Sequence, residues 1–308
     1  MQIRKSLMLV LTLVAIISMV FVGCGGGTEE AAPAEESQEA EQAEAQESAA
    51  EESDFDTDYE DGVYFAQEDG FNERTGWKYM ATIVVESGEI VEAEWNGAHV
   101  ENGTDKITRS ESGEYGMVDN SDAQWPWYEQ AARAEEHLLE TQDPTQITYT
   151  DEQGHTDAIS SVSIHVVEFF DLAEEALSGE PTGYGMWQDG TYYAEADSFS
   201  DSGWKDAVSL TVVSGYIVAA NWDPIAEDGG TNKKQRSMDG EYGMVANSNA
   251  QWPWWEQARA AEQYLIEVQD PAAIELDDTG NADAISGATI HVDGFVSVVE
   301  KALEGAGR

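Results

Sequence analysis

The sequence predicts an α+β fold that is built twice, and three observations support this prediction. The chain repeats itself at a spacing of about 127 residues, which is the size of a whole domain. In each copy, β-branched and aromatic residues gather around a Ser-Gly turn before any helical pattern begins. Apolar residues at helical spacing then follow in two segments. Strands that precede helices, without alternating with them, favour α+β over a parallel α/β sheet.

The repeat is visible as pairs of short motifs in the same order. The matching pairs are Asp61-Gly62 with Asp189-Gly190, Gly76–Lys78 with Gly203–Lys205, Gly88 and Trp95 with Gly215 and Trp222, Glu114–Val118 with Glu241–Val245, and Gln124–Trp127 with Gln251–Trp254. We therefore predict two homologous domains, residues 59–180 (the first repeat) and residues 185–308 (the second repeat). Glycine and proline cluster between them, as expected of a junction.

Each repeat is expected to begin with a β-hairpin and to continue with a helix. Residues 79–95 and 207–222 flank the Ser-Gly turns. After each Trp-Pro-Trp motif, a helix is predicted over 128–141 and over 255–268, and an Asp-Pro pair closes both. A last helix is predicted from about residue 290.

The N-terminus has the pattern of a lipoprotein signal peptide over residues 1–23. Arg4 and Lys5 precede an apolar run that ends at Gly23-Cys24, and this run is short for a membrane span. Small Gly23 before the chain's one cysteine resembles a lipobox, although Phe21 replaces the usual leucine. The mature protein is expected to begin at a lipidated Cys24; the alternative is an uncleaved anchor.

Residues 24–58 consist mainly of Gly, Ala, Glu, Gln and Ser. Such a segment buries too little apolar surface to offset its ordering entropy, so an acidic disordered linker is expected. The formal net charge of the whole chain is -48, which argues against nucleic-acid binding.

The candidate functional motif is Asp283–Thr289, Asp-Ala-Ile-Ser-Gly-Ala-Thr, directly before the last predicted helix. Free N–H groups at a helix start favour a phosphate, and glycine allows close approach of the backbone. Thr289 is then the residue that faces the phosphate. The alternative is that Thr289 merely caps the helix.

This motif resembles the flavinylation motif of FMN-binding domains, which occur in Na+-pumping NADH:quinone reductases, Rnf complexes and bacterial surface lipoproteins. In that family, a flavin transferase moves FMN from FAD onto the last threonine and forms a phosphoester bond. The resemblance implies covalent FMN on Thr289, and it assigns the rest of the motif to Asp283, Ser286, Gly287 and Ala288.

The first repeat departs from this motif, because it has Ser161, Val162 and Ser163 where the second has Gly-Ala-Thr. Serine can supply an ester oxygen, and Ser163 is therefore a possible second FMN residue. Ser161 and Val162 add side chains where a transferase must approach. We therefore expect one FMN adduct, on Thr289.

A flat flavin needs flat apolar walls, and Met244, Trp252 and Trp254, with Trp255 beside them, are candidates. The alternative is that these side chains pack the core. Lys205 is a candidate for pairing with the phosphate, with a surface ion pair as the alternative.

Other chemistry has little support in the sequence. One cysteine excludes an intramolecular disulfide and a CxxCH haem attachment. The five histidines show no HExxH spacing, and no Walker loop or Gly-x-Ser-x-Gly elbow is present. We expect no metal site and no catalytic residues.

Taken together, the resemblance implies a lipid-anchored flavoprotein on the outer face of the cytoplasmic membrane. Its expected role is to relay electrons through FMN in extracellular electron transfer, as a carrier more than a turnover enzyme. The implied partners are the flavin transferase, a membrane donor such as a quinol-linked dehydrogenase, and acceptors such as ferric iron. The alternatives are a flavin-free binding or adhesion lipoprotein, or a lipoprotein whose signal peptide yields a pheromone.

Overall fold

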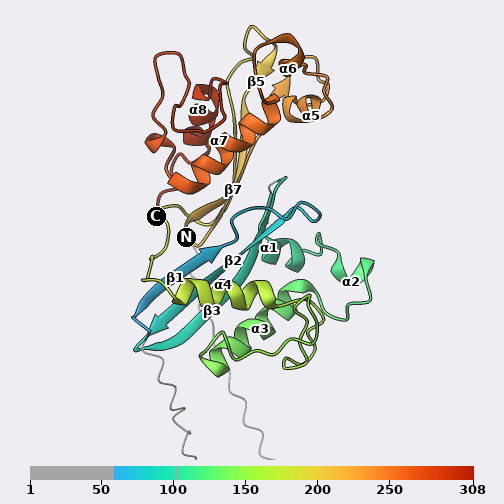
Figure 1. Cartoon of the computed structure of the whole chain (residues 1–308), viewed down its shortest axis with the longest axis vertical. Helices are drawn as coiled ribbons and strands as arrows, with labels where there is room; N and C mark the ends of the chain where they lie inside the picture. Colours follow the sequence, from blue (N-terminus) through green and yellow to red (C-terminus); the bar gives the residue numbers. More distant parts are fainter. Residues whose placement is uncertain (1–58, 102) are drawn as a thin grey trace, which may run out of the picture. The chain divides into compact units, whose positions relative to one another are not determined.

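A computed structural model describes residues 59–101 and 103–308, and these residues belong to one compact unit. The predicted signal peptide, Cys24 and the acidic linker lie outside the described residues. The structure contains helices and antiparallel sheets, which confirms the α+β class (Figure 1). Within 59–101 and 103–308, no helix is long and apolar enough to cross a membrane.

The first repeat is a three-stranded antiparallel sheet followed by four helices. Strand order in the sheet is β1-β2-β3. Its strands and helices are β1 (Gly62–Gln67), β2 (Trp77–Glu86), β3 (Glu89–His99), α1 (Lys106–Glu111), α2 (Met117–Asn120), α3 (Trp127–Thr141) and α4 (Val167–Leu177). Helix α3 packs on β3, while α4 packs on β1 and β2.

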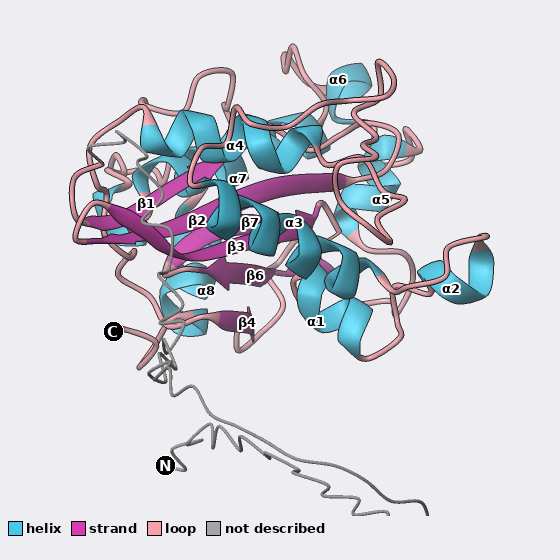
Figure 2. Cartoon of the chain, turned by 90° about the horizontal axis from the view of Figure 1, so that it is seen from below, coloured by secondary structure: helices cyan, strands magenta, loops and turns pink. Residues whose placement is uncertain are grey.

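The second repeat follows the same order of strands and helices, except that its long hairpin is divided: β4-β6-β7 form one sheet, and β5 pairs with β8 in a small second sheet. Its elements are β4 (Gly190–Glu195), β5 (Trp204–Lys205), β6 (Ala207–Val213), β7 (Tyr216–Trp222), β8 (Ile225–Ala226), α5 (Lys233–Met238), α6 (Met244–Asn247), α7 (Trp254–Val268), a 3-10 turn (Pro271–Ala273) and α8 (Asp293–Ala302). Helix α7 packs on β7, and α8 packs on β4 and β6. Figure 2 distinguishes these helices and strands by colour.

Both predicted hairpins are present. Ser87 and Gly88 have φ of 57° and 80°, and Ser214 and Gly215 have φ of 52° and 83°. Two consecutive residues with positive φ give a turn whose twist matches that of the flanking strands. The first hairpin runs from Trp77 to His99, which is longer than the sequence indicated.

The two long helices also form where they were predicted. Each ends at a glutamine in the left-handed conformation, Gln142 with φ of 60° and Gln269 with φ of 64°. The Gln142 side chain accepts from Ile90 N at 2.7 Å and donates to Ile90 O at 3.0 Å, and Gln269 binds Ile217 in the same way. The end of each helix is thereby fixed to the start of a hairpin strand.

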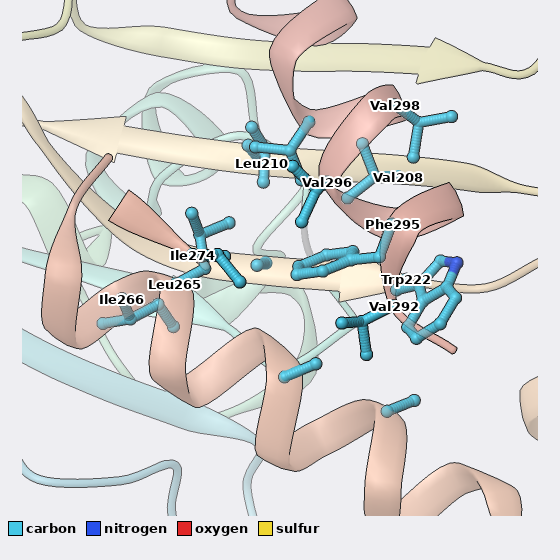
Figure 3. Close-up of a cluster of buried hydrophobic side chains, with 14 of the residues drawn as sticks. Val208, Leu210, Trp222, Leu265, Ile266, Ile274, Val292, Phe295, Val296 and Val298 are labelled. Atoms are coloured by element: carbon cyan, nitrogen blue, oxygen red, sulfur yellow. The ribbon is translucent and has the colours of Figure 1, made fainter. Parts of the chain in front are cut away.

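Aromatic side chains join the helices to the sheet in each core. In the second repeat, the Trp222 ring lies 5.0 Å from that of Trp254 and 5.1 Å from that of Phe295, between centroids. Figure 3 shows Phe295 of α8 in this cluster, between Trp222 on one side and Leu265 and Ile274 on the other. In the first repeat, Trp95 lies 5.1 Å from Trp127. These core contacts hold the ends of α3 and α7 beside the candidate sites.

A smaller apolar cluster joins the two repeats within the compact unit. It contains Met80 and Ala98 from the first repeat with Val213 and Val218 from the second. Beside it, the hydroxyls of Thr82 and Ser214 lie 2.7 Å apart and are buried. The two sheets are therefore held together by side chains of both repeats.

Candidate functional site

Each repeat contains a cavity, and the two cavities are lined by residues at matching positions. The volume is about 370 Å³ in the second repeat and about 340 Å³ in the first. The matching pairs are Trp204 with Trp77, Asp206 with Tyr79, Lys233 with Lys106, Tyr242 with Tyr115, Met244 with Met117, Trp254 with Trp127, Thr289 with Ser163, and His291 with His165. The repeat therefore preserves a cavity as well as a fold.

Thr289 lies at the edge of the second-repeat cavity, in an exposed loop. Its backbone N donates to Gln257 Oε1 at 2.7 Å, and its hydroxyl Oγ1 donates to the same oxygen at 3.1 Å. Helix α8 starts four residues later, and its N-cap is Val292. Thr289 therefore does not cap the helix, and the alternative explanation for this residue is wrong.

Gln257 is the residue that organises this site, and the sequence analysis did not identify it. It is only 2% exposed on α7. Its Nε2 donates to the Trp252 carbonyl at 2.8 Å and lies 3.5 Å from Met244 Sδ. One buried amide therefore joins the Thr289 loop to both other shared motifs. A glutamine three residues after each buried tryptophan was the available signal in the sequence.

The first repeat keeps the same arrangement despite its altered motif. Ser163 donates to Gln130 Oε1 from N at 2.7 Å and from Oγ at 3.2 Å. Ser161 has φ of 63° where Gly287 has 83°. The serine therefore adopts the left-handed conformation that glycine adopts more readily. The substitutions change the side chains in this loop and keep its hydrogen bonds to the buried glutamine.

The remaining motif residues lie around the loop and do not line the cavity. Asp283, Ser286 and Gly287 are exposed, and Ala288 packs against the core. A Cβ at Gly287 would meet no atom within 4 Å, so no close neighbour requires glycine at this position. The positive φ of residue 287 is the feature that favours glycine there.

The candidate flavin-stacking residues separate into two groups. Met244 and Trp254 line the cavity, and Trp254 is also a core residue. Trp252 is 52% exposed and contributes its carbonyl to Gln257, and its ring does not line the cavity. Trp255 lines a different cavity. Trp204 and Tyr242, with ring centroids 6.0 Å apart, are further aromatic walls that the sequence analysis missed.

A lysine lies at the aromatic wall of each cavity, and both were missed. Lys233 Nζ is 4.6 Å from the Trp254 ring centroid and 5.1 Å from that of Tyr242. Burial lowers the pKa of Lys233 to about 8, and the nearby Asp206 carboxylate opposes this shift. By contrast, Lys205 Nζ lies 2.9 Å from Glu195 Oε1. Lys205 therefore forms an ion pair, which was the alternative to phosphate binding.

The acidic neighbour of the lysine differs between the repeats. Asp206 accepts from Trp222 Nε1 at 2.8 Å in the second repeat, where the first has Tyr79. A side chain at Gly294 would collide with Asp206; in the first repeat the matching position holds Glu168, and Tyr79 replaces the aspartate. The carboxylate near the lysine therefore comes from a strand edge in one repeat and from a helix in the other.

Among the residues that the structure describes, no group of three or more His, Cys, Asp or Glu side chains could hold a metal ion.

No protein-family model matches the chain, and no match is found among curated proteins. Two solved structures are similar to part of it. One is the solution NMR structure of a Clostridium thermocellum protein, which has a TM-score of 0.33. Its sequence is 46% identical to this one, and the match covers 41% of this chain and 97% of the other. The other is the crystal structure of a Clostridium perfringens protein, which has a TM-score of 0.32. Its sequence is 26% identical to this one, and the match covers 39% of this chain and 89% of the other.

Proposed function

We propose that this protein is a lipid-anchored electron carrier that holds FMN on Thr289 through a phosphoester bond, in the second of two tandem FMN-binding-type domains. One observation carries the proposal. Buried Gln257 fixes the loop so that the Thr289 hydroxyl lies at the edge of a cavity with aromatic walls and a lysine.

The residues present fit FMN. Trp204, Tyr242 and Trp254 offer flat apolar surfaces of the kind that a planar ring system binds. Lys233 is the positive charge that would bind a phosphate or an electron-rich ring edge. Bound FMN supplies reversible electron transfer, while the protein supplies attachment, orientation and charge.

The rest of the motif supports modification by a second protein. Asp283, Ser286 and Gly287 are exposed around Thr289, so a flavin transferase can reach them without unfolding the chain. The same exposure allows a membrane donor, such as a quinol-linked dehydrogenase, and an acceptor, such as ferric iron, to approach the site. These partners follow from the proposed role.

The test is co-expression of the full chain with a flavin transferase. We expect the denatured protein to keep a yellow, fluorescent flavin, with one FMN adduct on the peptide that contains Thr289, because a covalent bond survives loss of the fold. The folded protein should be bleached by dithionite and recoloured by a ferric acceptor. A colourless protein would favour a flavin-free binding module, and a flavin that no external acceptor reoxidises would contradict the relay.

The proposed location on the outer face of the cytoplasmic membrane depends on Cys24. A Cys24→Ser chain has no thiol to carry lipid, so it should appear in the medium or remain as an unprocessed precursor. Fractionation of cells followed by immunoblotting measures this. Membrane retention and processing identical to those of the unchanged chain would contradict the lipid anchor.

A further inference from the structure

The first-repeat cavity has a different charge from the second. Arg74, Lys106 and His165 line it, and no carboxylate is among its lining residues. The second-repeat cavity is lined by Lys233 together with Asp206 and Asp293. In a chain with a formal net charge of -48, a cavity lined by the basic side chains of Lys106 and Arg74 is a local exception. Such a lining favours an anion.

Lys106 is the centre of this charge. It is 1% exposed, and its Nζ lies 4.4 Å from the Trp77 ring centroid and 4.6 Å from that of Tyr115. Its Nζ also donates to the Tyr79 hydroxyl at 2.7 Å. Among residues 59–101 and 103–308, Glu168 and Glu68 are the carboxylates that act on Lys106, and neither lies within ion-pair distance of it; Glu168 pairs with His165 at 3.3 Å. A buried ammonium without a paired charge is costly, and a bound anion would offset that cost.

The geometry otherwise matches that of the proposed FMN cavity. Trp77, Tyr115 and Trp127 stand where the second repeat has Trp204, Tyr242 and Trp254. Gln130 holds the Ser163 loop as Gln257 holds that of Thr289. Flat walls, a fixed loop and two cations together suit a ligand with both a ring system and a phosphate.

We propose that the first-repeat cavity is a second site of this protein, which binds a phosphorylated planar heteroaromatic of the FMN class reversibly, with Lys106 and Arg74 as its anion ligands. This inference shares its ligand class with the proposed function and does not need a covalent bond. Ser163 contributes to the wall of the site, while Ser161 and Val162 make its loop a poor match for a transferase.

The proposal implies a defined pH dependence. Burial lowers the pKa of Lys106 to about 7, and the carboxylates of Glu168 and Glu68 oppose this shift. Below that pH the amine is protonated and attracts phosphate; above it the amine becomes neutral, so binding should weaken as the pH rises. The other titratable or charged groups that face this region are Tyr79, His99, Arg109, Tyr115, His165 and Arg74.

The experiment uses the full chain with Thr289→Ala, which has no covalent acceptor in the second repeat. Free FMN is titrated, and quenching of flavin fluorescence by the aromatic walls reports binding. We expect Lys106→Met to weaken FMN binding at least about tenfold, the effect of one charge-assisted hydrogen bond. Riboflavin, which lacks the phosphate, should bind more weakly than FMN by a similar factor.

The titration is repeated in a Lys233→Met background, which weakens any binding of free FMN at the other cavity, and the binding that remains should still depend on Lys106. Arg74→Gln, at an exposed position that cannot disturb the core, should weaken binding a few fold. Between about pH 7 and pH 9, where the phosphate keeps its charge, affinity should fall more steeply in the chain with Lys106 than in Lys106→Met, where His165 is the remaining cavity base that loses its charge.

Several results would overturn the proposal: no FMN binding, equal binding of riboflavin, or binding that depends on Lys233 and not on Lys106. Because the variant lacks Thr289, these results are independent of covalent attachment. An FMN adduct missing from wild-type protein after co-expression would contradict the proposed function and leave this titration unaffected.

Discussion

A Thr289→Ala chain that is co-expressed with a flavin transferase should carry no flavin after denaturation, compared with about one per chain for the wild type. The variant removes the oxygen to which we assign the phosphoester. Its fold should persist, because the backbone N of residue 289 still donates to Gln257 and only the 3.1 Å hydroxyl contact is lost. That contact is worth about 1 kcal/mol, which is small beside the stability of a domain. In-gel fluorescence and peptide mass spectrometry give the measurement.

Two matched variants sharpen this result. Thr289→Ser keeps a hydroxyl in the same loop and should keep at least part of the signal, while Ser163→Ala changes the corresponding residue of the first repeat and should leave the signal unchanged. Flavin that survives denaturation in Thr289→Ala would place the covalent bond elsewhere. Loss of flavin in Ser163→Ala would show that we assigned too much weight to Ser161 and Val162.

Gln257→Leu should reduce flavin attachment without touching the acceptor hydroxyl. The leucine removes the acceptor for Thr289 N and Oγ1 and the donor to the Trp252 carbonyl, so the loop loses its fixed position. Leaving these groups without partners should also lower the free energy of unfolding by about 1 to 3 kcal/mol. Urea unfolding measures the stability, and the flavin content of purified protein measures attachment.

Gln130→Leu is the control, because Gln130 makes the same contacts with Ser163 and the Trp125 carbonyl. It should cost a similar free energy of unfolding and leave the flavin on Thr289 intact. Equal flavin loss in both variants would mean that instability alone explains the effect. Full attachment in Gln257→Leu would remove Gln257 from its positioning role.

Local patterns were sufficient for much of the fold. The Ser-Gly turns impose positive φ at Ser87 and Gly88, and the long helices show their apolar period directly. The short helices α1, α2, α5 and α6 were missed, since segments of four to six residues are too short to show a helical period. Strands β1 and β4 were also missed, although each pairs with the first strand of the hairpin that follows it.

The sequence alone determined the repeat, the α+β class and the choice of Thr289, because each depends on neighbouring residues or on matching segments of one chain. Only the tertiary structure decided which side chains surround Thr289. Gln257 and Lys233 come from separate helices; Gln257 binds the Thr289 loop and Lys233 lines the same cavity as Thr289, and packing of the helices brings them there. The tertiary structure also decided the charge difference between the two cavities. Asp206 and Glu168 occupy unrelated positions in their repeats, and only the fold brings each near a buried lysine.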